Sequence, residues 1–193
     1  VVEGTRTRVQ AFEGVVIADI LQDDPRLTYL QEKGIPFVAF GRSQTTGHYP
    51  WIDLDFEAAT HDAVARLVSQ GHTRVGLGST AGGINFGRVV ERAFGDAMRQ
   101  HGIAPHDARI FNLGMSEHDG YLLGDRWFAI AERPTALILA NELMAVGLYR
   151  RLAEGGATPG RDVALITLIE QQSMRFLEPR PTHFATDLFG LGH

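Results

Sequence analysis

The sequence predicts an α/β fold built on doubly wound parallel sheets with helices on both faces. Two observations predict it. Short apolar runs of strand length alternate with longer stretches in which apolar residues recur at helical spacing, and this alternation continues without a break in composition. The 193-residue chain has 44% hydrophobic and 21% charged residues, which is ordinary for a globular protein. A chain of this length forms one large domain or two smaller lobes.

Residues 133–166 give the clearest part of the pattern, because they predict a strand, a helix and a second strand. Residues 136–140 and 163–166 are apolar runs typical of strands buried on both faces. Between them, apolar residues at three- and four-residue spacing predict a helix that Asn141 caps and that a glycine pair ends. We expect a right-handed βαβ unit with Asn141 and Glu142 at the carboxyl end of its first strand, where ligands of such sheets bind.

The other elements are predicted by the same signals. In the first part of the chain we expect strands at residues 14–18, 36–40 and 50–54, the last at a sheet edge because it begins with Pro, and a helix from residues 23–25 to Gly34. In the rest we expect helices at 55–70, 86–101, 116–131 and 170–177, strands at 74–77, 109–112 and 183–186, and a glycine-rich loop at 78–83.

Composition excludes several classes of function. The net charge is −5, whereas a surface that binds the phosphate backbone is usually basic, so this segment is not expected to hold nucleic acid itself. The absence of Cys excludes disulfides, thiolate metal sites and a cysteine nucleophile. No apolar run approaches the roughly 20 residues of a membrane span, and the start has no signal-peptide core. Because the chain has no initiator Met and no obvious caps, we expect a fragment of a longer protein.

Residues 76–81 fit the GxGxxA pattern of a nucleotide site after a strand. The pattern requires a helix to follow at once, but Gly82 and Gly83 disfavour that helix by roughly 1 kcal/mol each. We therefore favour a loop at the end of a strand. The eight histidines include no HExxH and no pair on a shared helix face, and the sequence has no GxSxG elbow. We expect no metal, no cofactor and no catalytic triad.

Polar residues at strand ends remain as candidates for function. They are Asp19, Arg42, Asn141, Glu142, Glu170 and Thr186, with Trp51, Met115 and Arg88 nearby. Carboxylates, amides and a guanidinium that converge in a cleft suit a polyhydroxylated ligand, since each accepts from or donates to hydroxyl pairs. The alternative, that each residue only caps a helix, stays open for every one of them.

A resemblance to a known family rests on ordered segments that cover nearly the whole chain. They are Gly14-Val15-Val16-Ile17; Gly34-Ile35-Pro36-Phe37-Val38; Asp55, Ala63, Leu67 and Gly71-His72-Thr73-Arg74-Val75; Arg92-Ala93-Phe94 with Ala97-Met98; Arg133-Pro134-Thr135-Ala136-Leu137-Ile138, Ala140-Asn141-Glu142, Met144-Ala145 and Gly147; Pro159 with Asp162-Val163-Ala164-Leu165-Ile166; and Pro181-Thr182. In this order they resemble the effector-binding core of the LacI/GalR (lactose-repressor/purine-repressor) family of bacterial transcription regulators.

The resemblance implies a two-lobed, periplasmic-binding-protein-like (type I) core that closes on a sugar or a nucleoside-like ligand. It implies a cytoplasmic homodimer that binds operator DNA through a helix-turn-helix head absent from this chain, and that does not bind a membrane. The first strand of the core also has no counterpart here. We expect residues 1–70 with 186–193 to form one lobe and residues 71–185 to form the other.

Effector-contacting positions of the family fall on or beside residues of this chain. They are Asp19, Arg88, Met115, Asn141, Glu142, Glu170 and Thr186. Two departures stand out. Ile169 replaces the sugar-binding Asp, within Thr167-Leu168-Ile169-Glu170, and Val90 aligns with the effector-binding Arg, which leaves Arg88 or Arg92 as the substitute.

The implied mechanism is an open–closed equilibrium that the ligand shifts by its differential affinity, with a coupling of roughly 1–3 kcal/mol. We expect part of the dimer surface on the helix that carries Leu27 and Leu30. Two other classes stay open. One is a periplasmic sugar-binding protein of an ABC transporter, and the other is an enzyme on a doubly wound sheet that uses Asp19 or Glu170.

Overall fold

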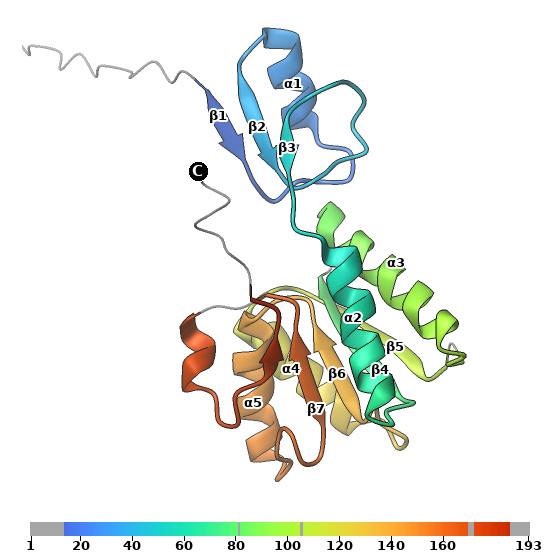
Figure 1. Cartoon of the computed structure of the whole chain (residues 1–193). Coiled ribbons are helices and arrows are strands. Elements are labelled where there is room, and N and C mark those ends of the chain that lie inside the picture. Colours follow the sequence, from blue (N-terminus) through green and yellow to red (C-terminus); the bar gives the residue numbers. More distant parts are fainter. Residues whose placement is uncertain (1–13, 81, 105, 170–171, 186–193) are drawn as a thin grey trace, which may run out of the picture. The chain divides into compact units, whose positions relative to one another are not determined.

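The computed structural model describes residues 14–80, 82–104, 106–169 and 172–185 (Figure 1). The chain divides into two compact units, Val1–Asp53 and Leu54–His193. Each unit contains parallel strands and the helices that pack on them, as the α/β prediction requires.

The first unit has a three-stranded parallel sheet in the order β1-β2-β3 with one helix (Figure 1). Its elements are β1 (Val15–Ile17), α1 (Pro25–Lys33), β2 (Phe37–Phe40) and β3 (Trp51–Ile52). The side chain of Asp24 caps α1, Pro25 occupies the first turn, and Gly34 ends the helix at φ 63°. The predicted helix start, helix end and edge position of β3 are therefore confirmed.

One expectation for this unit is wrong. The apolar run at residues 14–18 predicts a buried strand, but Val15 and Val16 are 38% and 75% exposed, and β1 lies at an edge, pairing only with β2 among the described residues. The dimer surface was expected in part on the helix that carries Leu27 and Leu30. These two side chains are 0% and 8% exposed and pack inside the unit with Ile17, so they do not contribute to such a surface. A dimer surface on other residues of this helix stays a prediction.

The second unit has a five-stranded parallel sheet in the order β5-β4-β6-β7-β8. Its strands are β4 (Val75–Thr80), β5 (Ala108–Leu113), β6 (Ala136–Leu139), β7 (Ala164–Thr167) and β8 (Thr182–His183). Its helices are α2 (Phe56–Ser69), α3 (Asn85–Gln100), α4 (Glu117–Phe128), α5 (Leu143–Glu154) and the short 3₁₀ helix η1 (Gln172–Phe176).

Helices cover both faces of this sheet. Neighbouring residues of a strand point to opposite faces, so the apolar central strands have side chains to bury on both. Ile138 of β6 packs with Val64 of α2 and Phe94 of α3 in one core. Leu137 packs with Leu148 of α5 in the other, which also contains residues of α4. The predicted doubly wound arrangement is confirmed in this unit.

Strand β4 is longer than predicted, since it continues to Thr80, into the segment assigned to a glycine-rich loop. All six of its residues are buried. A Cβ on Gly78 would lie 3.0–3.2 Å from side-chain atoms of Leu123, Met144 and Leu139. Glycine at this position lets α4 and α5 pack closely on the strand. From sequence alone the glycines predict a loop, and the predicted strand therefore ends too early.

The boundary between the units also lies earlier than the sequence predicts. Contacts divide the chain after Asp53 rather than near residue 70. The reason is that α2 packs through Phe56, Val64 and Leu67 into the core of the second unit. The expected return of residues 186–193 to the first lobe lies outside the described residues and stays a prediction.

Candidate functional site

The carboxyl edge of the five-stranded sheet gathers several of the predicted site residues. The strands lie in register, with Gly78 beside Leu139 and Leu139 beside Thr167. Met115 follows β5, and Asn141 follows β6, each two residues beyond the end of its strand. Because parallel strands in register end at one edge, both residues lie on the side of the sheet where α/β proteins bind ligands.

Asn141 has a structural task at this edge. Its Oδ1 accepts a hydrogen bond of 2.7 Å from the backbone N–H of Leu143, the first residue of α5. The predicted cap is therefore confirmed, and the side-chain NH₂ is the part of Asn141 that suits a ligand. Glu142 follows and is only 4% exposed. Burial raises the pKa of Glu142, and a contact with its own backbone N–H opposes this in part.

Met115 and Arg88 stand on neighbouring connections. Met115 is half-buried and precedes Ser116, which forms a capping box with Asp119 at the start of α4. The Ser116 hydroxyl donates to the Asp119 carboxylate and lowers the pKa of Asp119. Arg88 lies exposed in the first turn of α3 and makes no ion pair within the part of the chain that the structure describes. Its guanidinium is available to a ligand with acceptor groups.

Ser79 is a polar residue near this edge that the sequence did not single out as a binding residue. It is 0% exposed, and its Oγ is the buried side-chain atom without a hydrogen-bond partner among the described residues. A Cβ on Gly87, in the first turn of α3, would lie 3.7 Å from this oxygen. A buried hydroxyl without a hydrogen-bond partner lowers the stability of the fold, and such groups are rare in proteins. The junction of β4 and α3 contains one.

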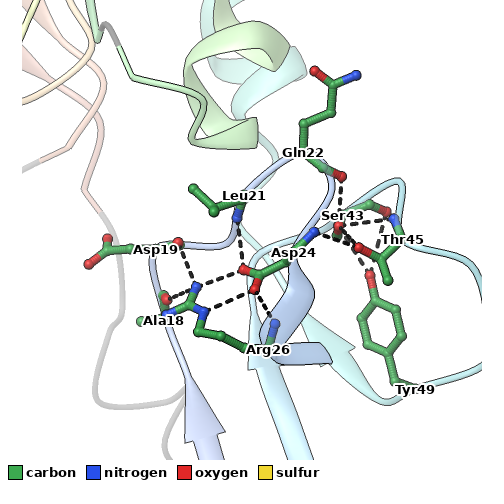
Figure 2. A network of polar contacts seen from close by, with 9 residues as sticks. All are labelled: Ala18, Asp19, Leu21, Gln22, Asp24, Arg26, Ser43, Thr45 and Tyr49. Carbon is green, nitrogen blue, oxygen red and sulfur yellow. Dashed lines mark hydrogen bonds and ion pairs between the residues drawn. The ribbon is translucent and has the colours of Figure 1, made fainter. Parts of the chain in front are cut away.

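Asp19 lies in the first unit, just beyond the carboxyl end of β1. Its backbone adopts φ 52°, and it is the non-glycine residue with positive φ among those described. Figure 2 shows why this conformation holds: the Nη2 atom of Arg26 donates to the carbonyl oxygens of Ala18 and Asp19, at 3.1 and 2.9 Å. The Asp19 side chain is exposed and points away from this network (Figure 2).

Asp24 holds Arg26 in place. It is 1% exposed, and its carboxylate accepts from Arg26 Nε at 3.0 Å and from Arg26 Nη2 at 2.7 Å. It also accepts from the backbone N–H groups of Leu21 and Arg26, each at 3.0 Å. These donors, above all the guanidinium of Arg26, lower the pKa of Asp24 although burial opposes them.

A second loop supports the first (Figure 2). The backbone N–H of Asp24 donates to Thr45 Oγ1 at 2.7 Å, and Ser43 Oγ donates to the carbonyl oxygen of Gln22 at 2.7 Å. The Tyr49 hydroxyl accepts from the backbone N–H of Ser43 at 3.2 Å. The polar residues of this loop, Ser43 and Thr45, thus fix the connection between β1 and α1.

The remaining candidate residues are either paired within the first unit or lie outside the described residues. Arg42 pairs with Asp53 at 2.8 Å and lies 5.8 Å from the ring centre of Trp51, so its charge is already engaged inside the first unit. Glu170 and Thr186 lie outside the described residues. The described residues hold no cluster of His, Asp and Glu that could bind a metal ion, and none of their helices is long and apolar enough to cross a membrane.

Asp24 and Arg26 are the residues that sequence reasoning missed as site residues. We read Asp24 only as the start of a helix, which it is, and gave Arg26 no role. One sequence signal was available. Arg26 follows the capping residue Asp24 by two positions, which places its guanidinium beside the Asp24 carboxylate in the first helical turn.

Comparison with known proteins now adds to the geometry. The sequence profile of the periplasmic binding protein-like domain matches residues 64–193. The HTH-type transcriptional regulator AglR of Rhizobium meliloti is 30% identical over 155 residues, which cover 80% of this chain and 44% of that protein. The regulator RafR of Escherichia coli is 28% identical over 158 residues, which cover 82% and 46%. The chain thus spans about half the length of these relatives.

Solved structures agree. A regulatory protein of the LacI family from Chloroflexus aggregans is 27% identical with a TM-score of 0.78, over 89% of this chain and 62% of that one. A LacI regulator from Bacillus cereus subsp. cytotoxis has a TM-score of 0.85 at 19% identity, over 93% and 64%, and supports the fold alone. The chain therefore belongs to the periplasmic binding protein-like domains, in the form found in the LacI/GalR family of transcriptional regulators.

Proposed function

We propose that this chain is the effector-binding and dimer-forming part of a cytoplasmic transcriptional regulator. It senses a small polar metabolite, a sugar or a nucleoside-like compound, and controls operator binding by a helix-turn-helix head. The relatives named above support the proposal, since they are HTH-type regulators. Because the chain spans about half of each relative, the operator and the homodimer are part of the proposal as well.

The observation that carries the proposal is the set of polar groups at the carboxyl ends of parallel strands. In the second unit, the NH₂ of Asn141 and the guanidinium of Arg88 offer donors. In the first unit, the exposed carboxylate of Asp19 offers acceptors. Donors and acceptors of this kind match the hydroxyl groups of a sugar, and Met115 adds an apolar surface for a ring face.

The ligand acts by mass action on a conformational equilibrium. It favours the state of the regulator that it binds more tightly, and the shift cannot exceed the difference between its affinities for the two states. A coupling of roughly 1–3 kcal/mol changes operator affinity by about 5- to 150-fold. We propose this range for the link between effector and operator.

Two other functions are less supported. A periplasmic sugar-binding protein of an ABC transporter shares the fold, but the relatives named above are HTH-type regulators. An enzyme is disfavoured for the same reason. Asp19 remains a candidate binding residue and not a catalytic one.

Thermal-shift screening tests the proposal. The probes are D-ribose, D-galactose, maltose, raffinose and adenosine. At a hundredfold excess over its dissociation constant, a ligand adds about 2.7 kcal/mol to the free energy of unfolding. At least one probe should raise the melting temperature of the chain.

A matched pair of variants assigns the site. Asn141→Asp keeps the oxygen that caps α5 but removes the NH₂ donors, so we expect it to abolish the ligand-induced shift. Gln100→Glu makes the same chemical change at the far end of α3 and should leave the shift intact. The assignment of Asn141 to the binding site is wrong if no probe shifts the wild-type chain, or if both variants respond as the wild type does.

A further inference from the structure

The inference concerns the β1–α1 connection in the first unit, and it rests on the proposed function. Asp19 combines a backbone conformation that L-residues rarely adopt with an exposed carboxylate. Asp tolerates the left-handed region better than most residues, but the conformation still persists only when the surroundings impose it. A strained residue at the end of a strand is a reason to look for function at its side chain.

One guanidinium imposes the conformation. Arg26 Nη2 donates to the carbonyl oxygen of Ala18, which precedes Asp19, and to the carbonyl oxygen of Asp19 itself. These two carbonyls belong to the peptide planes on either side of the Asp19 Cα atom. Holding both planes on one donor fixes φ and ψ of Asp19 together, and therefore the direction of its Cβ atom.

The guanidinium is itself held from behind. Its Nε and Nη2 atoms bind both oxygens of the buried Asp24 carboxylate, a two-point contact that a Lys cannot reproduce. Asp24 is tied to the same connection by the N–H of Leu21 and to the second loop through Thr45. The chain of contacts runs from the second loop through Asp24 and Arg26 to Asp19, as Figure 2 shows.

The carboxylate of Asp19 accepts no hydrogen bond from the described residues. The positive charge of Arg26 acts on it, but Nε and Nη2 of Arg26 donate to Asp24 and to two carbonyl oxygens. The Asp19 side chain is exposed. A ligand group that meets it must supply hydrogen-bond donors, as a hydroxyl pair or an ammonium does, and an anionic group is repelled.

We propose that Asp24 and Arg26 are positioning residues that lock Asp19 in a left-handed conformation and thereby present its carboxylate to a donor group of the effector. Neither residue touches the ligand. Both act through the backbone of Asp19, which is the residue that binds.

A double-mutant cycle tests this coupling in the whole chain. Calorimetry measures the affinity for whichever of the five probes shifts the wild type. Asp19→Asn keeps the shape but removes the charge, and Arg26→Lys keeps the charge but removes the fork. Each should weaken binding about tenfold, and the double variant should lose little more than either single variant. Arg161→Lys is the control, because Arg161 forms a similar contact with Asp162 on the surface.

The cycle distinguishes positioning from mere support of the fold. A merely structural Arg26 would lower the melting temperature while the dissociation constant, measured well below melting, stays at the wild-type value. That result, or single effects that multiply in the double variant, overturns the proposal.

A second arm needs no ligand, so it still decides the question if no probe binds and the proposed function fails. Asp19→Gly relieves the left-handed backbone and should raise the melting temperature by ~2–4 °C. In the Arg26→Lys background residue 19 is no longer held, so the same change should give no gain. An equal rise in melting temperature in both backgrounds, or no rise in either, would show that Arg26 does not hold Asp19 in its left-handed conformation.

Discussion

At the scale of single residues, two buried carboxylates have pKa values that are shifted in opposite directions. Asp24 is 1% exposed, yet its pKa is lowered because Arg26 and backbone N–H groups donate to it. Glu142 is 4% exposed, and its pKa is raised because burial outweighs the contact with its own backbone N–H. Asp24 therefore stabilises the fold above its unfolded pKa, and this contribution is lost as the pH falls through its folded pKa. The ionised carboxylate of Glu142, by contrast, destabilises the fold.

Replacing Glu142 makes that effect measurable. A raised folded pKa means that ionisation destabilises the folded state, with the full penalty above the folded pKa and none below the unfolded pKa. Glu142→Gln removes the penalty and keeps the shape, so we expect a higher melting temperature at pH 7. The gain should shrink as the pH falls toward the unfolded value of about 4.3.

The matching control is Glu178→Gln, which makes the same change at an exposed position. Its melting temperature at pH 7 should be that of the wild type, because this side chain is exposed. A Glu142→Gln variant that is less stable at pH 7 would show that the carboxylate has a partner that compensates for its burial.

At the scale of elements, the close approach of α4 and α5 positions the loops that carry Met115 and Asn141. Gly147 of α5 lies against the backbone of α4, where a Cβ atom would overlap the carbonyl oxygen of Glu117. Gly120 of α4 is placed in the same way against Met144. The two glycines set the distance between the helices, and so the spacing of the two loops.

Alanine substitutions separate this packing from helix propensity. Gly147→Ala should lower the free energy of unfolding by about 1–3 kcal/mol, because the added methyl group overpacks a backbone contact. Gly95→Ala in α3 should raise it by roughly 0.5–1 kcal/mol, since its Cβ would meet only Arg99 Nη1 at 3.5 Å and alanine favours the helix. Urea unfolding measures both. If Gly147→Ala is as stable as Gly95→Ala, the close approach of α4 and α5 does not require glycine at this position.

The elements were largely predictable from sequence because their signals are local. Apolar spacing and caps gave every helix and strand of the second unit to within a few residues, and Asn141 does cap α5. The extent of β4 was not predictable, because Gly78 serves packing against residues far away in the chain.

The places of the candidate residues in the fold were predictable, but their contacts were not. Strand ends indicated Asp19 and Asn141, because the carboxyl edge of a parallel sheet follows from topology. The contact of Arg26 with the carbonyl oxygens of Ala18 and Asp19 depends on the path of a loop. The unpaired hydroxyl of Ser79 depends on how β4 meets α3. No pattern of residue types encodes either arrangement.

At the scale of the whole molecule, the two units differ in the size of their cores. The buried core of the first unit consists of Ile17, Ile20, Leu27, Leu30 and Ala39. The second unit has two larger cores, one on each face of its sheet. Because burial of apolar surface is the main favourable term in folding, the first unit should open at a lower free energy than the second.

Hydrogen exchange followed by mass spectrometry tests this difference on the 193-residue chain at pH 7. The amides of β2 should exchange faster than those of β6, because β2 belongs to a small core and β6 lies in the middle of a sheet covered on both faces. A bound effector that engages Asp19 should slow exchange in β1 and α1 most, since it binds only the folded form of the β1–α1 connection and so stabilises it. Equal protection of β2 and β6 without ligand would mean that the two units unfold as one cooperative body, and the separate opening argued here would be wrong.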